Sequence, residues 1–240
     1  MTQELSKWLA PILGRDEALF LELKQLKDKL GTDIPEALDF ASYKPNYGWF
    51  LMQPDGIHGV THETRVMVLS ELLSRMYLSN NGDHNDLDTD VIKIASLTHD
   101  VRRECDDRRD PEHGYRAARF YLENIARGNG RDHEKVAYLN EWHVPDDSLV
   151  PEMILELNIF KDADALDRVR AISPHQRTDP KYLRLDYSRD LVRTSEFFYR
   201  ITNILVANDF GPYDAVMEAA LVLGIVKQPS TSVYVPDVLF

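Results

Sequence analysis

Apolar residues recur at three- and four-residue spacing through most of this chain, which is the pattern of amphipathic α-helices. A glycine at position 31 is placed to end the second of these helices. No segment alternates apolar and polar residues as a strand does, so we predict an all-α fold. The predicted helices cover residues 5–13, 16–31, 35–40, 60–79, 87–99, 111–127, 132–143, 150–172, 189–208 and 213–225.

The breaks between helices do not divide the chain into separate domains. Residues 43–56 form a loop rich in Tyr, Pro and Gly, and residues 80–88 form a polar one. The tail, 227–240, is apolar but interrupted by prolines, so we expect it to lie extended over a surface. A chain of 240 residues can bury a sizeable core. We predict a single compact domain over 1–240, with an N-terminal helical lobe (1–55), a core (56–208) and a C-terminal helix and tail (209–240).

The composition and net charge limit the classes of binding partner and the cellular compartment that we expect. The net charge of −12 argues against binding to nucleic-acid backbones, although a metal site could still attract a small phosphorylated substrate. Cys105 is the only cysteine, so no intramolecular disulfide can form, and we interpret it as a small core-side residue. No apolar run reaches membrane-spanning length and the N-terminus does not resemble a signal peptide. We expect a cytoplasmic protein without a membrane partner, with delivery as a secreted effector left open.

Several residues of metal-binding type lie in segments that otherwise look buried. His62 shares a helical face with Val66 and Leu69, and His99 continues the apolar stripe of its own segment. Buried polar groups of this kind need hydrogen bonds or a metal ion. Adjacent helical residues diverge by about 100°, so His99 and Asp100 could share an ion at a helix end.

A third segment, IFKDADALDRVR, adds carboxylates. Asp162 and Asp164 lie on adjacent faces, and periodicity alone does not choose between them as a ligand. Asp164 could instead pair with Arg168, and Asp167 with Arg170. Imidazoles and carboxylates together suit a divalent ion such as Mn, Fe, Zn, Mg, Co or Ni, which activates water near neutral pH.

The order His, His-Asp, Asp resembles the HD superfamily of metal-dependent phosphohydrolases. His62 lies in HETRV, an H-x-x-R-V form of the first motif, and His99 and Asp100 end LTHD. ADALDRVR is similar to the A-D-x-L block of the last motif, which also occurs in the hydrolase half of the stringent-response enzymes. The resemblance covers residues 56–190 and selects Asp164 as the fourth ligand, with Asp162 behind the ligands or structural. It implies a helical HD domain that hydrolyses a phosphate ester, and we expect the substrate to be nucleotide-like.

The resemblance also implies roles for other histidines, although less directly. His143, and after it His113, could bind a second metal ion or a substrate phosphate. His133 is interpreted as a solvated helix start, and His84 and His175 as exposed loop residues.

The catalytic assignments lie on either side of the metal motifs. His58 could orient substrate, act as an acid or cap the next helix. Glu104 could be a general acid or base, and Arg103 could hold a phosphate. Arg102, Arg168 and Arg184 are the predicted substrate-binding arginines. For residues 102–104 the alternative of a charged, exposed helix end carries equal weight.

Three alternatives to a nucleotide phosphohydrolase stay open. The motifs HGVTHETRV, HDVRRE and KDADALDRVR, with YLRLDYS, look like a subgroup of bacterial HD proteins and, to a lesser degree, the phosphodiesterase domain of SidE-type effectors, which acts on ADP-ribosylated or phosphoribosyl-linked ubiquitin. A mixed-valence di-iron oxygenase is another, and a non-catalytic regulatory HD domain the third. The six ligands of the oxygenase would be His62, His99, Asp100, His113, His143 and Asp164. Substrate identity, metal number and oligomeric state are not determined by the sequence.

Overall fold

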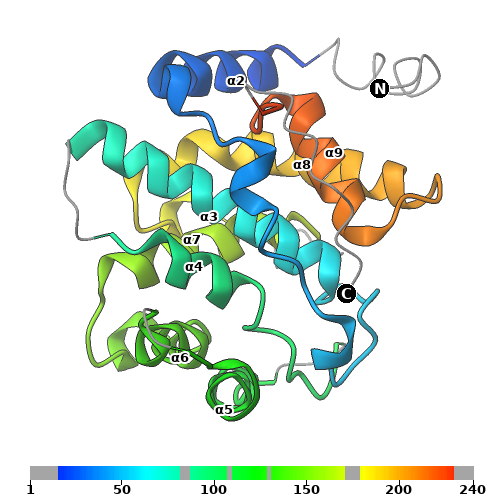
Figure 1. Ribbon diagram of the computed structural model, residues 1–240. Helices are drawn as coiled ribbons and strands as arrows, with labels where there is room; N and C mark the ends of the chain where they lie inside the picture. The colour runs from blue at the N-terminus through cyan, green and yellow to red at the C-terminus, as the bar shows by residue number, and fades with distance from the viewer. Residues whose placement is uncertain (1–15, 82–86, 107–109, 129–130, 171–178, 230–240) are drawn as a thin grey trace.

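The all-α prediction is confirmed in the computed structural model (Figure 1). The structure describes residues 16–81, 87–106, 110–128, 131–170 and 179–229. Within these ranges the only β-type pairing is an isolated bridge between Glu36 and Lys227. The helix expected over 5–13, the loop histidines His84 and His175 and most of the tail lie outside the described residues.

The described ranges contain α-helices of 8 to 22 residues, joined by short 3-10 turns. None of them is long and apolar enough to cross a membrane. They are α2 (Glu17–Leu30), α3 (Val60–Asn81), α4 (Thr89–Ser96), α5 (His113–Phe120), α6 (His133–Trp142), α7 (Leu155–Leu166), α8 (Val192–Val206) and α9 (Pro212–Leu223).

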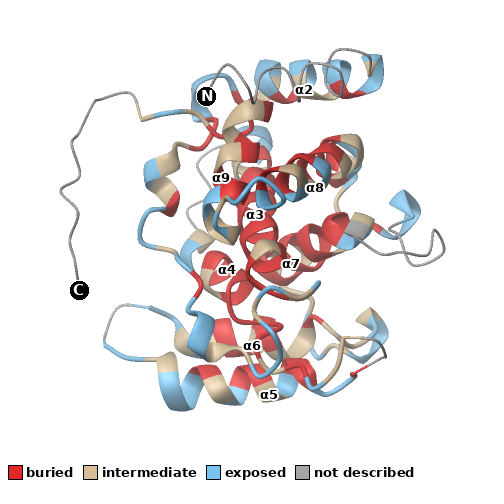
Figure 2. Ribbon diagram, turned by 90° about the vertical axis from the view of Figure 1, so that its right-hand side faces the viewer, coloured by how far each residue is buried: buried red, intermediate tan, exposed pale blue. Residues whose placement is uncertain are grey.

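Helix α3 is the centre of the fold. It contacts α2, α4, α7, α8 and α9, and most of its residues are buried (Figure 2). A helix surrounded in this way has no solvent-facing stripe, so even its polar residues enter the interior. His62, Glu63 and Arg65, in its first two turns, are all buried.

Most of the other helices lie at one of two opposite ends of the molecule, with α3 between them. Helices α5 and α6 pack on each other at the lower end in Figure 1, and α2, α8 and α9 lie at the opposite end. Helices α4 and α7 lie between, each in contact with both α3 and α6. Buried apolar side chains from Leu19 to Val226 form one continuous cluster. The polar centre described below interrupts this core where α3, α4 and α7 meet the α5–α6 pair.

Helix α4 ends earlier than the periodicity predicts. The Leu97 amide donates to both Lys93 and Ile94 carbonyls, which tightens the chain after Ser96. The hydroxyl of Thr98 donates to the Ile94 carbonyl and is also tied to Asn140 of α6. His99 and Asp100 therefore lie in a turn just past the helix.

The helix predicted over 35–40 is a 3-10 turn, η2 (Ala37–Phe40), and two longer predicted helices each end in a different type of helical turn. The segment 150–172 becomes α7, which begins at Leu155, followed by the 3-10 turn η6 (Asp167–Arg170). The segment 111–127 becomes α5 and a π-helical turn, η4 (Tyr121–Ile125). The change at the end of α7 matters for the site, since η6 carries Asp167 back towards α3.

Candidate metal centre

Four side chains of the predicted metal motif meet in the interior. The Nε2 atom of His62 lies 3.2 Å from Nε2 of His99, 3.4 Å from Oδ2 of Asp100 and 3.5 Å from Oδ1 of Asp164. They come from α3, from the turn after α4 and from α7, and all four residues are at most 9% exposed. The structure therefore gathers side chains that are separated by up to 102 positions in the sequence.

The structure also separates the roles of the two aspartates on α7. Asp162 is fully buried away from the cluster, where its carboxylate accepts hydrogen bonds from the backbone amides of Arg184 and Leu185 and from the Ser188 hydroxyl. It thereby holds the chain at the start of the turn η9 (Asp186–Leu191). Asp164 is the one brought to the histidines.

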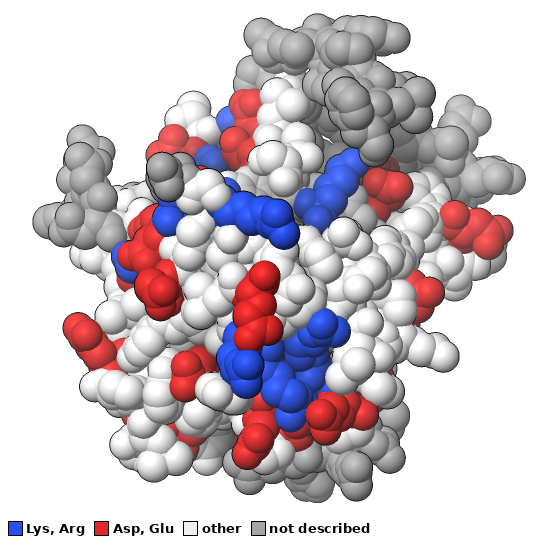
Figure 3. Space-filling model, turned by 60° about the horizontal axis from the view of Figure 1, so that its bottom comes forward, with Lys and Arg blue, Asp and Glu red and all other residues white. Residues whose placement is uncertain are grey.

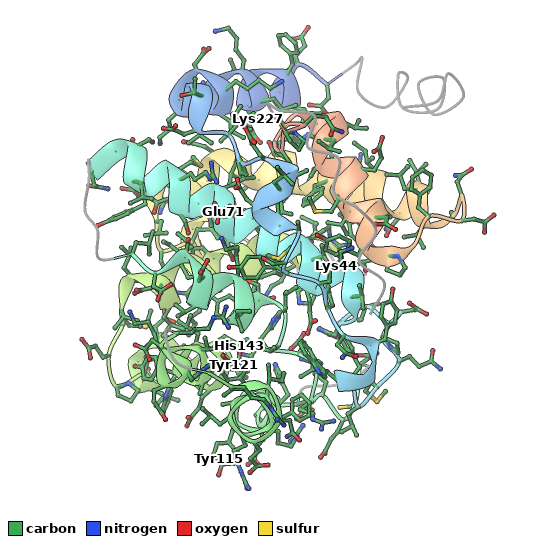
Figure 4. All side chains as sticks on the ribbon, in the orientation of Figure 1. Lys44, Glu71, Tyr115, Tyr121, His143 and Lys227 are labelled. Atoms are coloured by element: carbon green, nitrogen blue, oxygen red, sulfur yellow. The ribbon has the colours of Figure 1, made fainter. Side chains whose placement is uncertain are left out.

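A second group adjoins the first through Asp100. The Nε2 atom of His113 lies 2.9 Å from Oδ1 of Asp100 and 3.0 Å from Nε2 of His143. His143 follows α6 and lies in the lower half of the molecule in Figure 4. Asp100 thus presents Oδ2 to His62 and Oδ1 to His113, as a carboxylate between two metal positions would.

Four histidines direct their Nε2 atoms towards the carboxylate of Asp100. In each, Nδ1 contacts an oxygen acceptor, and a carbonyl oxygen can only accept, so Nδ1 carries the proton. When each ring is neutral, the Nε2 atoms carry no proton and face one another in pairs at about 3 Å, an arrangement that a bound cation relieves. The Nδ1 contacts are His62 to Asp167 at 2.8 Å, His99 to Ser96 O at 3.0 Å, His113 to Asp110 O at 2.5 Å and His143 to Asn140 O at 2.6 Å.

The protonation states suit metal ligands. Burial lowers the pKa of His99 to about 3, so its imidazole stays neutral. Burial opposes ionisation of Asp100, but His99 and His113 beside it outweigh burial and hold its pKa well below the usual range. A neutral imidazole and an ionised carboxylate are the forms that bind divalent ions.

His58 lies at the rim of the centre. Its Nδ1 atom is 2.7 Å from Oδ2 of Asp100, and its side chain is 16% exposed. A tight turn that includes Gly59 places His58 there. A Cβ on Gly59 would lie 1.9 Å from the carbonyl oxygen of Pro54. Only glycine permits that approach, and the Val60 amide closes the turn onto the same carbonyl.

Arg103 is the predicted arginine that reaches the centre. Its Nη1 atom is 3.6 Å from Oδ1 of Asp100, and the side chain is largely buried. The Nε group of Arg103 is buried and makes no hydrogen bond within the described residues. A guanidinium with a donor to spare therefore lies beside the second group.

Three other predicted residues are directed elsewhere. Arg102 lies over the ring of Phe120, 3.7 Å from its centre. The Glu104 side chain is 62% exposed and lies 3.6 Å from Arg116, at the surface rather than in the cluster. Arg184 pairs with Asp147 and Asp162 and so supports the fold. The structure therefore places none of these three side chains in the cluster.

The remaining predicted residues lie at the rim or away from the site. Arg168 is 3.8 Å from Asp164 and mostly exposed, as the i,i+4 pairing predicts. His133 begins α6, as predicted, and contacts the Tyr121 hydroxyl at 2.8 Å. Cys105 is half-buried, a few residues beyond the His-Asp pair.

Sequence reasoning missed two buried residues next to the ligands. Asp167 contacts His62 and Arg65, which the sequence did not predict, and the side chain of Arg170, its expected partner, lies outside the described part. Glu63 is fully buried, and burial, reinforced by Asp100, raises the pKa of its carboxyl well above the usual value. Glu63 has no local signal in the sequence, since a glutamate in the first turn of a helix is ordinarily exposed.

Comparisons with models of known protein families, with curated proteins and with solved structures give no match to this chain. The metal-binding potential of the site therefore rests on its own geometry. Three groups of three residues each bring their donor atoms within 4.8 Å of one another. The groups are His58, His62 and Asp100; His62, His99 and Asp164; and His99, Asp100 and His143.

Proposed function

We propose that the protein is a metal-dependent hydrolase of phosphate esters, built as an HD-type helical domain. The observation that carries the proposal is the meeting of four imidazole Nε2 atoms around the two oxygens of Asp100. The order of the motifs along the chain supports the same class.

The donor set fits one or two divalent ions. It offers the imidazole nitrogens of His62, His99, His113 and His143 and the carboxylates of Asp100 and Asp164, a mixture suited to ions such as Mn, Fe, Co or Zn. When bound, such an ion supplies an activated water molecule and positive charge for the reacting phosphate.

Arg103 favours an anionic substrate over a neutral one. Its guanidinium lies beside Asp100 and His113, and its buried Nε can donate to a phosphate oxygen. Arg168 adds positive charge at the rim, next to Asp164. This local charge matters because the chain as a whole carries −12. The positive charge of these two arginines is the feature that favours phosphate-ester hydrolysis over an oxygenase reaction at the same six ligands.

His58 is suited to proton transfer. Its ring touches Asp100 and lies at the rim, between the buried ligands and solvent. An imidazole in that position can hold a proton for the departing alcohol oxygen.

Figure 3 views the molecule from the end at which α5 lies. Lys and Arg side chains form small groups there, with acidic side chains next to them. On this face the pattern fits a small phosphorylated substrate better than a nucleic-acid backbone, which calls for a continuous basic surface.

The test is an assay of p-nitrophenol release from p-nitrophenyl phosphate and from bis(p-nitrophenyl) phosphate, with nucleotides as a second panel. The protein is stripped of metal and supplied in turn with Mn²⁺, Co²⁺, Zn²⁺ or Mg²⁺. We expect turnover that requires an ion and disappears in Asp100→Ala.

Two adjacent arginines provide a matched pair for the same assay. Arg103→Gln should lower kcat/KM by about 10- to 100-fold, since a charged hydrogen bond is lost. Arg102→Gln, which removes a guanidinium stacked on Phe120, should leave turnover nearly unchanged. Absence of turnover with every ion would refute the proposal, and oxygen uptake by the iron-loaded protein would favour the oxygenase.

A further inference from the structure

His62 differs from the other three histidines in how its Nδ1 atom is held. His99, His113 and His143 each contact the backbone carbonyl three residues earlier. His62 lies in the first turn of α3, where the corresponding carbonyl, that of Gly59, accepts from the Glu63 amide. Its Nδ1 contact is instead the carboxylate of Asp167, 105 residues later in the chain, at 2.8 Å.

Asp167 is in turn fixed by Arg65. The Nε of Arg65 donates to Oδ1 of Asp167 at 2.6 Å, and Nη2 donates to Oδ2 at 2.9 Å. This two-point pairing fixes the plane of the carboxylate. Both side chains are at most 2% exposed, and the Arg65 guanidinium packs over the ring of Tyr199 on α8, 5.0 Å from its centre.

We propose that the Arg65–Asp167 pair is a positioning device that commits His62 to the tautomer with its proton on Nδ1. That tautomer leaves the Nε2 lone pair directed at His99, Asp100 and Asp164. Because the pair itself lies outside the cluster, it tunes metal affinity without contacting the ion. The inference rests on the metal centre and not on the reaction proposed for it.

Replacing Asp167 by asparagine shows why the carboxylate matters. An amide has one acceptor oxygen where the carboxylate has two, and Arg65 and His62 together occupy both. The asparagine side chain would have to turn its NH₂ group towards one of these two partners. Turned towards His62, it would donate to Nδ1, move the ring proton to Nε2 and block coordination.

The test measures Co²⁺ affinity by competition with a chromophoric chelator, together with the visible spectrum of bound Co²⁺. Asp167→Asn should bind Co²⁺ about 10- to 100-fold more weakly than wild type, with an altered spectrum. Nitrogen NMR of the metal-free proteins should show the Nδ1-protonated form of His62 in wild type and its loss in the variant.

Asp162→Asn is the matched control, since Asp162 is equally buried on α7 but holds residues 184–188 instead of a histidine. It should lose stability yet keep wild-type Co²⁺ affinity in the folded state. Wild-type affinity and spectrum in Asp167→Asn would overturn the proposal, as would an equal loss of affinity in both variants.

If Asp167→Asn does not fold, Arg65→Lys decides the matter. Lysine keeps the charge but cannot form the two-point pairing, so a weaker Co²⁺ affinity is expected and an unchanged one would overturn the proposal. A wild-type protein that binds no Co²⁺ would refute both the inference and the proposed function, whereas an unchanged Co²⁺ affinity in the variants would refute the inference alone.

Discussion

Oδ1 of Asp100 lies 2.9 Å from Nε2 of His113, while Oδ2 of the same carboxylate lies 3.4 Å from Nε2 of His62. One side chain therefore belongs to both groups of histidines. Binding of an ion at either group changes the charge that the other group experiences, so occupancy of the two positions should be coupled.

The His113 group should bind metal in a pH-dependent way. Burial lowers the pKa of His113, but the charge of Asp100 and hydrogen bonds to Asp100 and Asp110 outweigh burial, and the net shift is upwards. The protonated ring cannot coordinate, so affinity should fall as pH decreases through this raised pKa, by up to about tenfold per pH unit. His99, with a pKa of about 3, stays neutral over the same range.

Calorimetric titrations with Mn²⁺ at pH 6, 7 and 8 measure this effect. His113→Gln should remove the pH-sensitive component and leave the remaining binding. Equal Mn²⁺ affinity at the three pH values in wild type would contradict the assignment of His113 as a ligand.

Lys161 anchors the segment that carries His143. Its Nζ donates to the carbonyls of Trp142 and Pro145 and lies 2.8 Å from Asp147. Lys161→Met should reduce the free energy of unfolding by about 1–3 kcal/mol, because the partly buried carbonyls lose their donor.

Urea unfolding of the metal-free protein tests this prediction. Lys24→Met is the control, since Lys24 forms only an exposed pair with Asp28 and its loss should cost less than about 1 kcal/mol. Similar midpoints for the two variants would show that the Lys161 contacts do not stabilise the segment.

Gly114 sets the distance between α5 and α6. A Cβ at this position would lie 2.5 Å from the Asn140 carbonyl oxygen, so Gly114→Ala should push the helices apart. We expect a loss of about 1–3 kcal/mol in stability from overpacking, together with weaker Mn²⁺ binding at His113 and His143.

Thermal unfolding and Mn²⁺ titration of the same samples check both effects. Gly211→Ala is the control, because its added Cβ would meet only the Asp214 carboxylate, at 3.4 Å. A Gly114→Ala protein with unchanged unfolding temperature and Mn²⁺ binding would show that the helices adapt without disturbing the histidines.

The helices and the meeting of His62, His99, Asp100 and Asp164 could largely be predicted from the sequence, since apolar periodicity is a local property and the motifs occur in a fixed order. Periodicity left Asp162 and Asp164 equivalent, and the family resemblance selected the one that the structure brings to His62. The end of α4 was not predictable in this way, because it depends on a side-chain contact between Thr98 and Asn140 of another helix.

Long-range contacts account for what the sequence did not reveal. The arginine three residues after Asp167 predicts only a local pair, and the contacts of Asp167 with His62 and Arg65 come from more than 100 positions away. Arg102 and Arg103 are chemically identical neighbours, and only the turn after Asp100 directs one to Phe120 and the other to the centre.

The most direct test of the central claim is the metal content of the folded protein after equilibrium dialysis against Mn²⁺, measured by elemental analysis for wild type and Asp100→Ala. Wild type should retain at least one ion per chain, and Asp100→Ala, which loses the carboxylate shared by both groups, should retain almost none. A wild-type protein without retained metal, or equal retention by the two proteins, would contradict the account.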